Sequence, residues 1–570
     1  MNDSSKGDSG SLRRRSIHPG SGRRQAVAFP RGRVLQAEEA AAVKALLGEA
    51  PRERALLIEY LHRIQDHEGC LPEGHLQALA EELRVPMAEI YEVATFYAHF
   101  DVVGSGEERP PKVTVRVCDS LSCALAGAEG LLRAVQEKLP GVRVLRAPCI
   151  GSCHTAPAAE VGHRHVDHAN AAKIEELALR GALDPEMPAY QGFDAYTKAG
   201  GYAALRACLA GARTAEDVIA LLSDGGLRGL GGAGFPTGRK WGLVRAEKAP
   251  RLMAVNGDEG EPGTFKDRIY LEREPHKFLE GMAIAAWAVE AEQVFIYIRD
   301  EYPAALEILR RELGTLAAAG LLAHTKVWVR RGAGAYICGE ESAMIESIEG
   351  KRGYPRHRPP YVAQVGLFGR PTLVYNVETL YWVPTILEKG AAWFAGQGKN
   401  GAKGLRSYSV SGRVKRPGVV LTAAGSTCRD LIAACGGMAD GHHFKGYLPG
   451  GASGGILPAY LADVPLDFGQ LEKHGCFVGS HAVVILSDKD DMKAVALNLM
   501  RFFEDESCGQ CTPCRNGTAK AVQLLGAERW NAQLLADLSE VMADASICGL
   551  GQAAPNPVKC VFKYFPEDLR

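Results

Sequence analysis

Eight of the fifteen cysteines form two groups of four whose spacings suit metal binding. The first group is spaced C-x4-C and C-x3-C, with 25 residues between the pairs, and the second is spaced C-x2-C-x2-C, with its fourth cysteine 33 residues later. The groups are Cys118, Cys123, Cys149 and Cys153, and Cys508, Cys511, Cys514 and Cys548. An odd cysteine total without an export signal argues against a disulfide framework and favours metal or redox use.

The first group lies on two loops of a small predicted α/β unit. Cys118 ends one predicted strand and Cys149 follows the next, so the loops can present four thiolates to one site. Small neighbours such as Ser122 and Gly151 let backbone N–H groups approach cluster sulfur. Four cysteines also suit tetrahedral zinc, but neither pair has the C-x2-C spacing typical of zinc. The pattern favours a [2Fe–2S] cluster, with zinc as the alternative.

The second group has the arrangement of a cubane site. Three closely spaced thiolates cap one face of the cluster and a distant fourth closes it. Pro513 stiffens the ligand loop, while Gly549 and Gly551 allow a tight turn around the inorganic core. The spacing therefore predicts a [4Fe–4S] cluster.

Four glycine-rich or polar segments lie between about residues 200 and 400. Glycines permit close backbone approach to a phosphate or ring, and helix N-termini hold anions. Acidic side chains at the carboxyl end of a strand can hydrogen-bond ribose or ribityl hydroxyls. Any one segment could be an ordinary turn, but together they predict a flavin and nucleotide site. The segments are Gly229–Gly238, Asn256–Gly263, Gly332–Ser342 and Tyr375–Thr379.

The elements that must position these residues belong to several domains, because 570 residues exceed a single core. Helical periodicity over about 37–100 precedes a small α/β unit. A long α/β region reaches about residue 400 and contains strand-like runs such as Leu252–Val255. Short β-like runs occupy about 405–488, and the last 80 or so residues return to helical periodicity.

Bulk composition is that of an ordinary globular chain, with 46% hydrophobic and 23% charged residues. The net charge of −1 gives no nucleic-acid signature. No apolar run is long enough for a membrane span, and the N-terminus lacks the apolar core of a secretory signal. A cytoplasmic protein is expected, with residues 1–33 as a flexible basic tail.

With these cysteine groups and glycine-rich segments, the chain resembles a known family. Its 200–560 region resembles the flavin- and NADH-binding subunit of respiratory complex I, and residues 37–180 resemble the neighbouring [2Fe–2S] subunit, here fused. The segments NGDEGEPGTFKDR (256–268) and EREPHKFLEGM (272–282) are most similar to β subunits of NAD-dependent formate dehydrogenases. The resemblance implies a multidomain α/β fold: a helical domain (34–105), a thioredoxin-like [2Fe–2S] domain (110–183), a Rossmann-like FMN- and NAD-binding domain (198–402), a β-grasp insert (403–488) and a helical [4Fe–4S] domain (489–570).

The resemblance also implies the cofactor contacts. Those implied for FMN are Gly229, Gly231, Lys240, Asn256, Asp258, Glu259, Gly260, Tyr336, Gly339, Glu340, Asn376 and Thr379. Those implied for NAD are Phe235, Glu261, Glu341, Arg358 and Tyr361. The chain departs from the complex I pattern at Leu230, Gly260, Tyr375, Arg358 and Tyr361, of which the last two keep the charge and the ring.

The expected function is that of an FMN-dependent diaphorase. Hydride exchange belongs to FMN and nicotinamide, so no side-chain nucleophile is required, and Glu261 is expected to orient the nicotinamide or exclude solvent. The expected partner is a molybdenum- or tungsten-containing α subunit that oxidises formate and carries further iron–sulfur clusters. Alternatives are the diaphorase subunit of an NAD-reducing hydrogenase, the NADH-input subunit of an NADH:quinone oxidoreductase, a cluster-holding scaffold without flavin, and a zinc-stabilised interaction protein.

Overall fold

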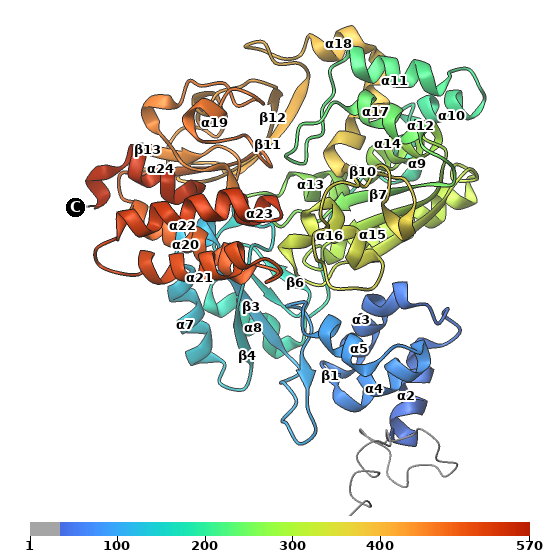
Figure 1. Ribbon diagram of the computed structural model, residues 1–570, viewed down its shortest axis with the longest axis horizontal. Coiled ribbons are helices and arrows are strands. Elements are labelled where there is room, and N and C mark those ends of the chain that lie inside the picture. The colour runs from blue at the N-terminus through green and yellow to red at the C-terminus, as the bar shows by residue number, and fades with distance from the viewer. Residues whose placement is uncertain (1–34, 570) are drawn as a thin grey trace, which may run out of the picture.

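The computed structural model describes residues 35–569 (Figure 1). The expected tail, 1–33, lies outside the described residues. The N-terminal part is helical, as its periodicity predicts: in α3, Leu57, Tyr60, Leu61 and Ile64 are all buried. Its elements are α2 (Ala37–Leu47), α3 (Leu57–Glu68), β1 (Leu71–Pro72), α4 (Glu73–Leu83), α5 (Met87–Ala94) and β2 (Val102–Val103).

A four-stranded sheet of order β4-β3-β5-β6 follows. Strands β3 and β4 are parallel and joined through α7, so both point their carboxyl ends toward the same edge. Cys118 pairs with Ala147 at that edge, and the two cysteine-bearing loops leave it together. The elements are β3 (Thr114–Cys118), α6 (Leu121–Leu125), α7 (Ala128–Lys138), β4 (Arg143–Ala147), β5 (Ala159–Val161), β6 (Arg164–Val166) and α8 (Ala171–Arg180).

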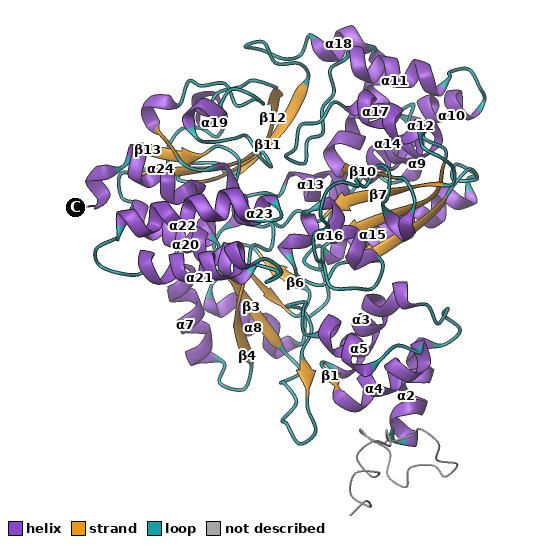
Figure 2. Ribbon diagram, in the orientation of Figure 1, coloured by secondary structure: helices purple, strands orange, loops and turns teal. Residues whose placement is uncertain are grey.

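The next sheet has order β10-β7-β8-β9 and is parallel throughout. Helices lie on both of its faces (Figure 2), which explains the continuous apolar runs of its strands. The strands are β7 (Arg251–Gly257), β8 (Ala291–Ile298), β9 (Lys326–Arg331) and β10 (Thr372–Asn376). The helices are α9 (Phe193–Lys198), α10 (Ala203–Leu209), α11 (Ala215–Asp224), α12 (Thr237–Ala246), α13 (Lys266–Arg273), α14 (Pro275–Ala288), α15 (Pro303–Ala318), α16 (Glu341–Ile348), α17 (Val377–Lys389) and α18 (Ala391–Ala395).

A mixed five-stranded sheet of order β12-β11-β15-β13-β14 comes next. Only the β11–β15 pair is parallel, and α19 connects β12 to β13, an arrangement consistent with the expected β-grasp insert. The elements are β11 (Leu405–Gly412), β12 (Gly418–Ala423), α19 (Cys428–Ala434), β13 (Phe444–Leu448), β14 (Leu457–Pro458) and β15 (Ala482–Ser487).

The chain ends in a helical bundle that lies between the other parts. In Figure 1 these red helices lie below the orange mixed sheet and above the teal sheet that carries Cys118. The helices are α20 (Met492–Asp505), α21 (Thr512–Leu525), α22 (Ala532–Ala545), α23 (Gly549–Ala553) and α24 (Asn556–Tyr564). Short 3-10 turns are η1 (Arg54–Leu56), η2 (Cys153–Thr155), η3 (Tyr336–Gly339), η4 (Leu367–Gly369), η5 (Ala452–Gly454), η6 (Ala459–Leu461), η7 (Glu472–His474) and η8 (Pro566–Leu569).

Side-chain contacts hold these parts together. Ser122 Oγ lies 2.9 Å from Ser411 Oγ, and Asn498 Nδ2 donates to the Asp119 carbonyl at 2.9 Å. These contacts join the thioredoxin-like sheet to both the mixed sheet and the bundle. No helix among residues 35–569 combines the length and apolarity needed to cross a bilayer.

Close packing of α14 on α17 yields a stability prediction. A Cβ on Gly281 would lie 1.9 Å from the Leu380 carbonyl oxygen, a backbone atom that cannot move aside cheaply. Gly281→Ala should therefore lower the free energy of unfolding by about 1–3 kcal/mol, measured as a lower Tm by calorimetry. The matched control is Gly314→Ala at an exposed position of α15, where a Cβ meets no atom within 4 Å. An unchanged Tm for Gly281→Ala would contradict this packing.

Candidate functional site

A cavity of about 290 Å³ opens at the carboxyl edge of the parallel sheet. The segments after β7, β9 and β10 all reach it because parallel strands end at one edge. Its wall contains most of the residues expected to contact FMN. These are Gly231, Asn256, Asp258, Glu259, Gly260, Tyr336, Gly339, Glu340 and Asn376.

The glycine-rich segment forms one wall as a tight backbone turn. Gly232 and Gly234 have φ values of 123° and 63°, which favour glycine. The fully buried Thr379 supports this turn, because its Oγ1 accepts a hydrogen bond from Leu230 N at 2.8 Å. Gly229 donates its N–H to the Phe235 carbonyl at 2.9 Å. Gly229 and Thr379 therefore shape the turn without lining the cavity.

Asn256 and Asp258 follow the end of β7. Asn256 Nδ2 donates to the Gly339 carbonyl at 2.8 Å, and its Oδ1 accepts from Asp258 N at 3.1 Å. Asp258 Oδ2 is buried and has no hydrogen-bond partner among residues 35–569. Burial raises the pKa of Asp258 well above its usual value. This oxygen is an acceptor that the protein itself leaves unused.

Two of the predicted carboxylates mainly cap helices. Glu259 accepts from Asp267 N at 2.9 Å and from Arg268 N at 3.1 Å, at the start of α13. Glu340 accepts from the first amides of α16, with Ala343 N at 2.9 Å. Each carboxylate satisfies backbone N–H groups that the helix leaves free. Their side chains position the cavity wall in addition to lining it.

Glu261 joins the cavity wall to the mixed-sheet domain. Its Oε1 accepts from Ser453 N and Ser453 Oγ, both at 2.7 Å, and its Oε2 accepts from the Tyr336 hydroxyl. All three residues line the cavity. Burial raises the pKa of Glu261. Residues far apart in sequence thus meet at one buried carboxylate.

The other residues expected at NAD lie outside the cavity wall. Phe235 and Tyr361 are 38% and 56% exposed. Arg358 pairs with Glu340 and, at 3.3 Å, with Glu341, which also pairs with Lys240 at 3.4 Å. Of these side chains, Arg358 and Glu341 form a charged group next to Glu340 of the cavity wall. Tyr375, a departure from the complex I pattern, donates its hydroxyl to the Thr237 carbonyl at 3.3 Å and does not line the cavity.

Several lining residues escaped the sequence analysis. Lys266 is 1% exposed and lies 2.9 Å from both Asp267 and Glu378. Although burial opposes its charge, these carboxylates raise the pKa of Lys266. Its place just after the acidic segment, at a helix start, was a usable signal. Ser453 and Leu550 come from other domains and carried no local signal.

The first cysteine group is buried throughout. Cys149 Sγ lies 3.3 Å from Cys153 Sγ, and Cys118 contacts Cys123 and Cys149. These contacts with Cys118 and Cys153 hold the pKa of Cys149 well below its usual value. The four sulfurs therefore gather at one buried site.

The second group lines its own small pocket, which residues of α21, α23 and η3 also border. Cys508, Cys511 and Cys548 are partly exposed and Cys514 is buried. Burial raises the pKa of Cys514 to about 11 and that of Cys548 to about 12, so cluster binding must release protons.

The second cysteine pocket shares a wall with the large cavity. Ile337 and Leu550 line both spaces. These two apolar residues therefore belong to both walls, and the two spaces are neighbours.

Comparison with known proteins decides the family. A profile described as Nuo51 FMN-binding domain matches residues 222–385, thioredoxin-like [2Fe-2S] ferredoxin matches 43–180, NADH-ubiquinone oxidoreductase-F iron-sulfur binding region matches 494–570, and SLBB domain matches 407–457. The F 2 chain of the NADH-quinone oxidoreductase of Rhizobium meliloti (strain 1021) is 40% identical, covering 70% of this chain and 97% of that protein. The chain belongs to the complex I-like NADH-binding flavoprotein subunits.

Two further likenesses concern hydrogenases. The HndC chain of the NADP-reducing hydrogenase of Solidesulfovibrio fructosivorans is 38% identical, covering 68% of this chain and 81% of that protein. A solved NAD+-reducing [NiFe]-hydrogenase in the air-oxidized state is 31% identical with a TM-score of 0.80, covering 92% of this chain and 94% of that chain. The matches to the family profiles confirm the predicted fold class. They also confirm the predicted cofactors, which are FMN, NAD, one [2Fe–2S] and one [4Fe–4S] cluster.

The large cavity suits FMN on its own chemistry. The unused Asp258 Oδ2 can accept from a ribityl hydroxyl, which removes the cost of an unpaired buried acceptor. At Gly231 a Cβ would lie 3.0 Å from Asn376 Cβ and narrow the space at the glycine turn. A buried cation, Lys266, also lines the cavity.

Asp258 provides a direct test of this fit. Asp258→Ala should weaken FMN binding about 5- to 150-fold, because a lost buried hydrogen bond costs about 1–3 kcal/mol. Flavin fluorescence titration of the deflavinated chain measures the change. The matched control, Asp224→Ala, lies at the exposed end of α11. Equal FMN affinity in the two variants would rule out the Asp258 contact.

Proposed function

We propose that this chain is a diaphorase that exchanges hydride with NAD at FMN and passes single electrons through the Cys508 cluster to a catalytic partner. The observation that carries this proposal is the shared wall of Ile337 and Leu550 between the flavin cavity and the second cysteine pocket. Exposure of Cys508, Cys511 and Cys548 leaves the far side of that cluster accessible to a partner.

The proposed ligands are the two cysteine groups. Cys118, Cys123, Cys149 and Cys153 would hold the [2Fe–2S] cluster, and Cys508, Cys511, Cys514 and Cys548 the [4Fe–4S] cluster. Since the first group is entirely buried, we assign it to a side store and not to the path toward the partner. The unequal burial of the two groups supports this division.

Bound FMN supplies the conversion between hydride chemistry and one-electron transfer. The protein binds and orients it: the glycine turn gives close approach, and Asp258 accepts from its hydroxyls. Glu261 is held by Tyr336 and Ser453. In that position it would orient the nicotinamide or keep solvent off the reacting face. Phe235 and Tyr361 are exposed rings on which NAD would stack.

We also propose, for residues 35–569, the five domain ranges that the family resemblance implies.

We further propose that the partner is a molybdenum- or tungsten-containing formate dehydrogenase α subunit in the cytoplasm. The support is the similarity of NGDEGEPGTFKDR and EREPHKFLEGM to formate dehydrogenase β subunits. The second candidate is an NAD-reducing hydrogenase, favoured by the likeness to the solved [NiFe]-hydrogenase across 92% of this chain.

Glu261 tests the proposed handling of nicotinamide. Glu261→Gln keeps the size of the side chain but removes its charge, so kcat/KM for NADH:ferricyanide reduction should fall about tenfold, or about 1.4 kcal/mol. Steady-state kinetics with matched FMN content measures the loss. The control is Glu216→Gln, a 71% exposed carboxylate on α11 that pairs with Arg245. If Glu261→Gln leaves NADH affinity and ferricyanide reduction unchanged, Glu261 has no role in handling the nicotinamide.

The division of labour between the two proteins is tested by purification. The isolated chain should be yellow, release FMN on denaturation and reduce ferricyanide with NADH, but it should not oxidise formate. A tagged chain purified from its native host should bring down a molybdenum or tungsten protein. A nickel–iron protein would establish the hydrogenase alternative, and formate oxidation by the chain alone would overturn the division.

A further inference from the structure

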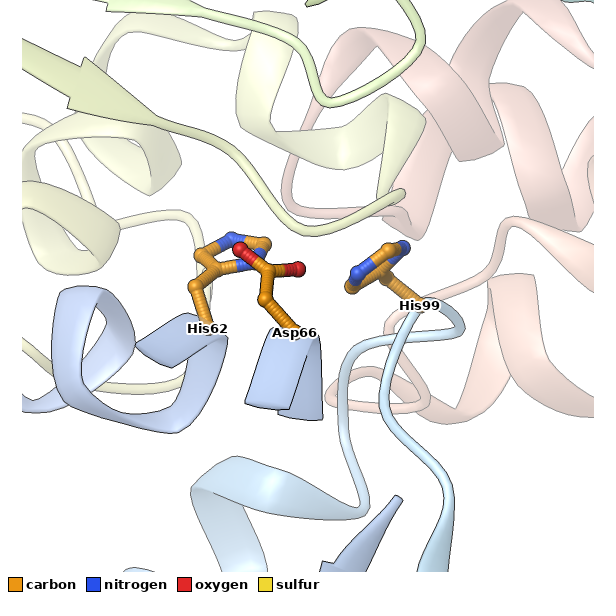
Figure 3. Close-up of side chains that lie close together, drawn as sticks. All are labelled: His62, Asp66 and His99. Atoms are coloured by element: carbon orange, nitrogen blue, oxygen red, sulfur yellow. The ribbon is translucent and has the colours of Figure 1, made fainter. Parts of the chain in front are cut away.

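Two buried histidine rings lie close together at the junction of the N-terminal helices and the parallel-sheet domain, with their centroids 5.0 Å apart. His62 lies on α3 and is 3% exposed, and His99 lies just after α5 and is 8% exposed. His62 Nδ1 and His99 Nε2 are both buried, and no residue in the described range 35–569 hydrogen-bonds to either. In the view of Figure 3, the Asp66 carboxylate lies between the His62 and His99 rings.

The opposite nitrogen of each ring fixes which atom carries the proton. His62 Nε2 lies 2.9 Å from the Gly332 carbonyl oxygen, which can only accept, so Nε2 carries the hydrogen. His99 Nδ1 lies 2.7 Å from Asp300 Oδ2, so Nδ1 donates there. In the neutral rings, His62 Nδ1 and His99 Nε2 therefore both present lone pairs. Each is a buried acceptor that no described residue satisfies, and leaving such acceptors unpaired is costly.

Asp66 completes a three-ligand set. One ligand atom from each of His62, Asp66 and His99 lies within 4.8 Å of the others. Arg331 donates to both Asp66 oxygens, at 2.6 and 3.3 Å, and pairs with Asp300 at 2.5 Å. His163 Nε2 lies 3.9 Å from Asp66 Oδ1. Counting both aspartates and the one arginine, these groups carry a net charge of −1, so the arginine does not reverse the attraction for a cation. Asp66 is 42% exposed and gives an ion access from solvent.

We propose that His62, Asp66 and His99 bind one divalent transition-metal ion of the zinc class. Two imidazoles, one carboxylate and a water make a four-coordinate site of the kind zinc accepts. Both rings donate their other N–H to a carbonyl or carboxylate, the outer arrangement that orients metal-binding histidines. The ligands belong to the N-terminal helices and their supports, Gly332 and Asp300, to the parallel-sheet domain, so the ion clamps the two parts together. The site is independent of the proposed electron path.

The test uses the full chain with flavin and both clusters loaded, so that no cluster cysteine is free to bind zinc. After dialysis against EDTA, Zn²⁺ is titrated in competition with a chromogenic zinc indicator, and bound zinc is counted by mass spectrometry of the elements. The wild type should bind one more equivalent than His62→Gln/His99→Gln. Zn²⁺ should raise the Tm of the wild type and not that of the double variant.

Two single variants keep the test decisive if the double variant does not fold. Asp66→Asn, at a partly exposed position, should weaken zinc binding at least tenfold. His67→Gln, whose side chain is 63% exposed on the same helix, should bind as the wild type does. Zinc X-ray absorption should report nitrogen and oxygen ligands. A wild type with no zinc beyond the double variant, equal affinities of Asp66→Asn and His67→Gln, or sulfur ligands would each overturn the site.

Discussion

One buried guanidinium connects the two cofactor regions. Arg299, 4% exposed at the end of β8, donates to the Glu259 carbonyl and to the Cys149 carbonyl, each at 2.6 Å, and pairs with Glu301 at 3.0 Å. The Arg299 guanidinium therefore holds both the segment that contains Glu259 and the loop that contains Cys149. A lysine could not make both bonds in this geometry. Because Glu301 neutralises the buried charge, Arg299 can hold the two loops without a large desolvation cost.

The parallel sheet positions Arg299 and the segments that surround the large cavity. All four strands end at one edge, so a glycine turn, an acidic segment and two helix starts meet around a single cavity. The C-terminal bundle then closes that cavity with Leu550, which also lines the cysteine pocket. The large cavity and the second cysteine pocket thus share lining residues, although these come from different parts of the chain. Function depends on packing between domains as much as on either site.

Several residues that the family resemblance implies as cofactor contacts also hold the site together. Glu259 and Glu340 cap helices α13 and α16, and Thr379 supports the glycine turn through Leu230 N. Sequence similarity identified these positions but could not separate residues that contact a cofactor from residues that only hold the site together. Residues of either kind occupy the same positions of the same motif. Lys266 shows the converse: its place after the acidic segment is visible in the sequence, but its burial between Asp267 and Glu378 is a tertiary property.

The sequence alone determined what is local: the cysteine spacings, the strands that precede the first cysteine group and the glycine turn. These follow from side-chain periodicity and chain geometry over a few residues. Only the tertiary structure decided which segments share a wall, that Ser453 reaches Glu261, and that His62 and His99 lie close together across 36 intervening residues. Such contacts arise when separate domains pack, and the residues that make them carry no pattern in their own neighbourhoods.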